Sequence, residues 1–120
     1  MATAMEIVQS HNAQEFVKLS ADFTTVNDKV KLCREMLVES PGIDSDEALA
    51  EVIGFLEACR DRLTDIIEAG TNGLLGEELF AQCLKTNDAV LRTLDAERVI
   101  HYYHKYNYFS NNIIIFIDWY

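Results

Sequence analysis

The stretch FVKLSADFTTVNDKVKLCREML, residues 16–37, has a regular apolar spacing that decides the fold class. This spacing places an apolar pair in each seven-residue period, along one side of an α-helix. The stretch predicts a long amphipathic helix from near Ser10 to Glu39 that ends before Pro41, because the residue preceding a proline avoids helical angles. The apolar residues recur in alternating steps of three and four, at Phe16, Leu19, Phe23, Val26, Val30, Cys33 and Leu37.

A second helix is predicted between Asp44 and Gly70. Asp44 and Glu47 are spaced as in a capping box, and their carboxylates suit the positive end of a helix dipole. We expect Gly70 to end this helix, because glycine tolerates the left-handed backbone that closes many helices. The predicted apolar stripe is Leu49, Val52, Ile53, Leu56, Cys59, Leu63, Ile66 and Ile67.

A third helix is predicted to begin between Gly73 and Leu75 and to run at least to Arg98. The two connections between the helices are short, so consecutive helices must lie antiparallel. The sequence thus predicts an all-α fold, an up-down-up three-helix bundle with long helices over residues 10–100, preceded by an extension at 1–9. The apolar side of the third helix is formed by Leu75, Leu79, Phe80, Cys83, Leu84, Val90, Leu91 and Leu94.

The final segment, HYYHKYNYFSNNIIIFIDWY at residues 101–120, differs in composition from the rest of the chain. It is rich in tyrosine, asparagine and isoleucine, and no helical period is visible after Tyr103. We assign it to an irregular C-terminal tail. An added strand, a disordered sticky segment and a read-through product stay open as explanations, since uncharged β-prone runs tend to aggregate.

The charge of the chain restricts its partners. Its 120 residues include 20 acidic and 10 basic side chains, a formal net charge of −10. This balance argues against nucleic acid and against an anionic membrane surface, which both need cationic side chains. It fits a solvated acidic surface or a basic partner. No apolar run reaches the roughly 18 residues that a membrane span needs, so we expect no direct membrane insertion.

The cysteines and histidines offer the only candidates for a metal or redox site. Cys33, Cys59 and Cys83 each fall on a predicted seam without a C-x-x-C pair, which favours free core thiols in a reducing compartment. His101 and His104 would share a helix face, but they lie in the aromatic tail. With no nucleophile beside a base and no phosphate-binding loop, we expect no enzyme activity, no metal and no cofactor.

An apolar strip on the first helix points away from the predicted seam. Around a seam centred on Val30 and Leu37, Leu32 lies roughly 140° away and Met36 roughly 100° away. Asp28 borders the same strip. Incidental exposure and the edge of a wide core face are the plain explanations. A contact surface is the alternative, because leucine and methionine four residues apart form a patch. We call Asp28, Leu32 and Met36 patch 1.

The third helix shows a related surplus. Around a seam near Cys83 and Val90, Phe80 lies roughly 60–80° off, Leu84 about 100° and Asp88 about 140°. Phe80, Leu84 and Asp88 thus form a strip at i, i+4 and i+8, which we call patch 2. A wide core face and a contact surface both remain open for it.

These motifs resemble a known family. TTVNDKVKLCREML (24–37) is similar to the V-N-x-x-V-x-x-x-x-E-M-L pattern in the first helix of GAT domains. LKTNDAVLRTL (84–94) resembles the L-x-x-[NS]-D-x-L pattern of their third helix, with Val90 in place of the usual leucine. The resemblance covers about residues 10–100. GAT domains are three-helix bundles in endosomal and trans-Golgi sorting adaptors of the GGA and Target-of-Myb groups.

The resemblance implies a non-catalytic module that recognises ubiquitin and ubiquitinated cargo. The family has two ubiquitin-contacting patches, whose positions match patch 1 and patch 2. It implies a cytoplasmic protein held peripherally at endosomes or the trans-Golgi network through its partners. No VHS domain, which carries lipid functions in relatives, is recognisable, so phosphatidylinositol binding is a family-level association only. No Arf-binding hook is recognisable, so we do not expect Arf binding. The alternative is a structural bundle that binds helical or coiled-coil trafficking proteins.

Overall fold

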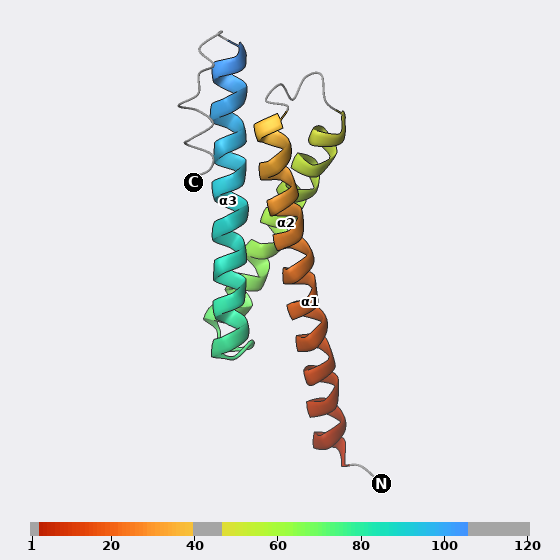
Figure 1. The fold of residues 1–120 in the computed structure, drawn as a ribbon. Coiled ribbons are helices and arrows are strands. Elements are labelled where there is room, and N and C mark those ends of the chain that lie inside the picture. The colour runs from red at the N-terminus through yellow and green to blue at the C-terminus, as the bar shows by residue number, and fades with distance from the viewer. Residues whose placement is uncertain (1–2, 40–46, 106–120) are drawn as a thin grey trace.

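The computed structural model describes residues 3–39 and 47–105, and within these ranges the secondary structure is entirely helical. It contains α1 (Ala4–Glu39), α2 (Glu47–Thr71) and α3 (Glu77–Lys105). The helices lie side by side in an up-down-up arrangement, as Figure 1 shows, and every pair of them is in contact. The predicted all-α bundle of long helices is therefore confirmed.

The core is built from the predicted seams, one on each helix. Phe23, Val30, Cys33 and Leu37 of α1 are buried, so the stretch that defined the fold class supplies a continuous row. The buried apolar residues of the other two helices and their connection are Leu49, Ile53, Leu56, Leu63, Leu75, Leu79, Cys83, Val90, Leu94, Ala96 and Ile100.

Phe16 departs from this pattern, although it belongs to the same apolar spacing. Phe16 is 37% exposed, because it lies at the end of the bundle, beside the turn that joins α2 to α3, and the N-terminal part of α1 extends beyond this turn (Figure 1). The spacing predicts which face of a helix is apolar. It does not predict where along the helix the neighbours stop.

The start of α1 and both ends of α3 differ from those predicted. α3 begins at Glu77 rather than between Gly73 and Leu75, because Gly73 and Gly76 have positive φ angles, which a right-handed helix does not contain. α1 begins at Ala4 rather than near Ser10, so most of the segment assigned to an extension is helical. α3 continues to Lys105, which makes the first part of the predicted irregular tail helical. Burial of Ile100 carries the seam close to that end, and a helix propagates readily once formed. The predicted stop at Pro41, the cap at Asp44 and residues 106–120 lie outside the described residues.

The turn after α2 corrects the prediction for Gly70. The amide of Gly73 donates to the carbonyl of Gly70, and the amide of Leu74 donates to that of Ala69. With Gly73 at a φ of 78°, this pair of bonds is a Schellman motif, so Gly73 closes the helix. Gly70 is buried inside α2, where the ring of Phe80 from α3 packs against its backbone.

Polar contacts set the register between α1 and α3. Asn27 Nδ2 donates to Thr86 Oγ1 at 3.0 Å, and Ser20 Oγ donates to Gln82 Oε1 at 3.0 Å. Thr86 is buried on the seam, where its methyl group packs and its hydroxyl accepts the amide. Side chain to side chain bonds of this kind favour one alignment of the two helices over a slide along the apolar row.

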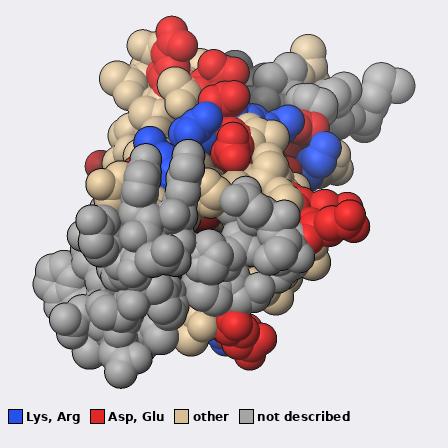
Figure 2. Space-filling model, turned by 90° about the horizontal axis from the view of Figure 1, so that it is seen from above, with Lys and Arg blue, Asp and Glu red and all other residues tan. Residues whose placement is uncertain are grey.

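The outer surface carries the acidic charge. Figure 2, which views the molecule from the end where α1 and α3 finish, shows acidic side chains at several separate points, with basic ones between some of them. Exposed ion pairs include Arg92 with Asp88, and Arg98 with Asp95. Such pairs contribute little to stability, about 0–1 kcal/mol each.

Candidate functional site

Patch 1 occupies one face of α1, close to the C-terminal end of the helix. Asp28 is exposed and Leu32 is 40% exposed, so the apolar side chain lies on the surface, as its angle from the seam predicts. Met36 is half-buried and packs against the core. The patch therefore has an exposed leucine at its centre, a carboxylate at one end and a partly anchored methionine at the other.

Patch 2 lies on α3. Leu84 is 44% exposed and is the most accessible apolar member of the patch. Phe80 is half-buried, because one side of its ring covers Gly70. Leu84 is therefore one helical turn from a phenylalanine ring that packs against α2. The predicted apolar side of α3 included Leu84, and the structure turns that residue to the surface.

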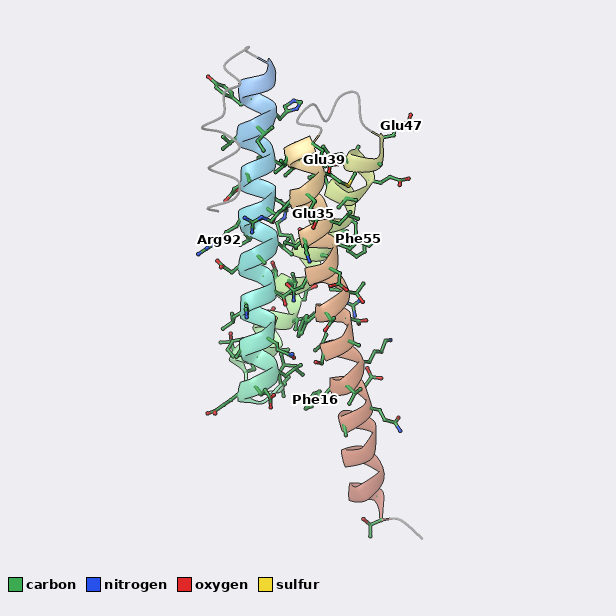
Figure 3. The ribbon with its side chains drawn as sticks, in the orientation of Figure 1. Phe16, Glu35, Glu39, Glu47, Phe55 and Arg92 are labelled. Carbon is green, nitrogen blue, oxygen red and sulfur yellow. The ribbon has the colours of Figure 1, made fainter. Side chains whose placement is uncertain are left out.

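The carboxylate of patch 2 is already paired. Arg92 Nε lies 3.1 Å from Asp88 Oδ2, one helical turn along α3. Figure 3 shows Arg92 on the outer side of α3, directed away from α1 and α2. Because both side chains are more than half exposed, the pair is weak, and a basic group of a partner can compete for the carboxylate.

Leu91 is a further exposed leucine of α3, and it lies next to patch 2 without being one of its residues. It follows Asp88 by three positions and is exposed, although the sequence placed it on the apolar side of the helix. Its angle from the seam resembles that of Phe80, which is half-buried. The two residues differ in their surroundings: Phe80 packs on α2 at Gly70, whereas Leu91 is 38% exposed.

Sequence reasoning missed a groove between α1 and α2. It has a volume of about 390 Å³, and Phe55 of α2, 40% exposed, lies on it. Phe55 is followed directly by the buried Leu56, so a helical rotation of about 100° turns it off the seam. Comparing helical angles along α2, as was done for the other two helices, would have shown that Phe55 is an apolar residue away from the seam.

The cysteines are core side chains with suppressed reactivity. Cys33 and Cys83 are buried and Cys59 is half-buried, and all three are free thiols. Burial, with a smaller contribution from Glu97, raises the pKa of Cys33 to about 12. Burial also raises the pKa of Cys59 and of Cys83. A protonated thiol is a poor nucleophile and a poor metal ligand.

One carboxyl group sits in an unusual environment. Glu97 of α3 is half-buried, and burial raises the pKa of its carboxyl, aided by Glu57 of α2 and opposed by His101 and Arg98. Within the described residues, no group of three or more His, Cys, Asp or Glu side chains is arranged to hold a metal ion. The predicted pair with His101 involves His104, whose side chain lies outside the described part.

Comparisons with protein-family models, with curated proteins and with solved structures find no match to this chain. In the described part of the chain, none of the helices is long and apolar enough to cross a membrane. The candidate site is therefore defined by the surfaces of the bundle itself.

Proposed function

We propose that this chain is a GAT-like adaptor module that binds ubiquitin and ubiquitinated cargo in endosomal or trans-Golgi sorting. The observation that carries the proposal is the repeated design of two patches. Each has an exposed leucine, Leu32 or Leu84, with an aspartate one turn away on the outer face of a three-helix bundle. Association with endosomes or the trans-Golgi network would follow from its partners.

The chemistry of the patches suits the surface of ubiquitin, an apolar patch ringed by basic residues. In patch 1, Leu32 supplies the apolar contact and Asp28 the acidic edge, and Met36 adapts its flexible side chain. In patch 2, Leu84 enters beside the ring of Phe80, and Asp88 exchanges Arg92 for a basic group of the partner. The acidic net charge favours the approach of such a partner.

The size of the patches sets the expected binding mode. Each contains only one well-exposed apolar side chain, so either contact alone buries much less than the roughly 1,200–2,000 Å² of a stable interface. We expect weak binding with fast exchange at each patch. Useful avidity would come from two patches engaging one ubiquitin chain or several ubiquitinated molecules.

The test is an NMR titration of the isotope-labelled chain with ubiquitin. We expect amide shifts around Leu32 and Leu84, and weaker binding in Leu32→Ala and in Leu84→Ala with unchanged helicity. Leu74→Ala is the matched control, since Leu74 is an exposed leucine at the turn after α2. No shifts at millimolar ubiquitin, or equal losses in the control, would refute the proposal.

A further inference from the structure

The groove between α1 and α2 is an apolar surface that belongs to neither patch. Of the described residues, those that line it come from α1 and α2 alone, so α3 does not cover it. Leu19, Val26, Cys59 and Ile66 pack against the core on one side and line the groove on the other. Its floor is therefore the outer side of the core itself.

The exposed aromatic ring of Phe55 is not explained by the packing of the bundle. Figure 3 places Phe55 at mid-height beside α1, on the opposite side of the bundle from Arg92. An aromatic ring at the edge of an apolar groove is a frequent anchor for a partner, because burying it gains both area and ring contacts. A groove between two antiparallel helices suits a further helix, which can pack its apolar face along the groove.

The charges at the groove reverse those of the two patches. Lys18 of α1 and Arg62 of α2 line it from opposite walls, and Asp22 is the single acidic residue among its described lining residues. The Arg62 guanidinium is close enough to the Cys59 thiol to oppose the rise that burial causes in its pKa. On a chain with twice as many acids as bases, a groove with two bases and one acid selects a negatively charged occupant.

We propose that this groove docks an amphipathic helix of a partner protein, with an apolar stripe flanked by acidic side chains. Apolar anchors at i, i+3 or i+4 and i+7 would follow the groove and cover Phe55. Acidic residues on the two flanks would reach Lys18 and Arg62. This partner differs from ubiquitin in shape and in charge, so the site goes beyond the proposed function and does not depend on it.

The proposed probe is a synthetic amphipathic helix with leucine anchors and glutamate flanks. A matched peptide carries lysine in place of each glutamate. We expect the acidic peptide to shift the amides of Thr25, Phe55 and Arg62 in the labelled full chain, and the basic peptide to bind at least about tenfold more weakly. The difference should shrink with added salt, because exposed charges are screened.

Charge reversal provides the decisive variant. The double change Lys18→Glu with Arg62→Glu should weaken binding of the acidic peptide about tenfold and strengthen binding of the basic one, because it reverses the charge on both walls of the groove. Both side chains are exposed, so we expect the fold to be unchanged. Lys31→Glu with Lys85→Glu is the matched control, because these exposed lysines lie outside the groove lining. Phe55→Ala, checked for folding by circular dichroism, should reduce the affinity for both peptides.

The outcomes separate this proposal from ubiquitin binding. Thr25 precedes Leu32 by seven residues, so the groove adjoins patch 1 along α1 and ubiquitin is best followed at Leu84. Ubiquitin shifts at Leu84 should persist in the Lys18→Glu, Arg62→Glu double variant. Equal binding of the two peptides, shifts centred on Leu84, or no shifts at millimolar peptide would overturn the proposal. Dilution-dependent shifts at Phe55 without peptide would assign the groove to a second copy of the chain and would also overturn it.

Discussion

The contact between Gly70 of α2 and the ring of Phe80 predicts the effect of Gly70→Ala. A Cβ added at Gly70 would overlap Phe80 Cδ2 and Cε2. Overpacking of this kind costs roughly 1–3 kcal/mol. Replacing glycine by alanine inside a helix gains about 1 kcal/mol. We expect a net loss of about 1 kcal/mol in the free energy of unfolding, because the overlap outweighs the gain in helix propensity.

The assay is urea denaturation of a double-mutant cycle formed by Gly70→Ala and Phe80→Ala. Without the aromatic ring, Gly70→Ala should stabilise the chain by about 1 kcal/mol through helix propensity alone. The sign of the Gly70→Ala effect should therefore reverse between the two backgrounds, with a coupling of about 2 kcal/mol. In thermal melts each kcal/mol corresponds to about 4–8 °C for a domain of this size.

Gly54→Ala is the matched control for this cycle. Gly54 lies in the same helix, and a Cβ added there meets no atom within 4 Å. It should stabilise both backgrounds by about 1 kcal/mol. If Gly70→Ala stabilises both backgrounds as Gly54→Ala does, the ring of Phe80 does not pack on α2. Phe80 would then not be held against α2 as part of patch 2.

Three further predictions test the interior of the bundle. The buried Thr93 hydroxyl lacks a hydrogen-bond partner among the described residues, so Thr93→Val should raise the free energy of unfolding by roughly 1 kcal/mol in urea titrations. The pKa of Glu97 is raised in the folded state, so its contribution to stability is greatest below the unfolded pKa and is lost as pH rises through the folded one. Glu97→Gln should therefore stabilise the chain at pH 7 more than at pH 4, and an equal effect at both pH values in thermal melts would contradict this. Cys59, half-buried, should react with a disulfide reagent faster than Cys33, whose pKa is about 12, as followed by mass spectrometry; the reverse order would disprove the assigned burial.

Much of the candidate site could be predicted because angle along a helix follows directly from position in the sequence. Leu32 and Leu84 each lie more than a quarter turn from the centre of their seam, and both are exposed. Met36 lies at about the same angle from its seam as Leu84, and Phe80 lies at a smaller one; both Met36 and Phe80 are half-buried. Whether residues at such an intermediate angle are covered depends on the neighbouring helix, which the sequence of one helix does not specify.

The polar seam positions were harder to predict. Thr86 and Thr93 lie on the same face of α3 as Cys83 and Val90, and both are buried. They were missed because threonine is not an apolar residue and so does not contribute to an apolar spacing. Asn27, part of the family-like motif, donates to Thr86 and aligns α1 with α3. That role becomes visible only when the two helices are placed together, because the partners are far apart in the sequence.

From the sequence alone, the three amphipathic helices, their antiparallel order and the exposure of Leu32 in patch 1 could be predicted. The physical reason is that helical periodicity and short connections act locally. The packing of the helices was needed to show that Gly70 is a packing site and that Gly73 closes α2. It was needed as well to show that Leu84 is exposed, that Phe16 lies at the edge of the bundle beside the turn after α2, and that Phe55 borders an open groove. Each of these depends on where a second helix begins, ends or crosses the first, and such contacts are set by side-chain packing between distant parts of the chain.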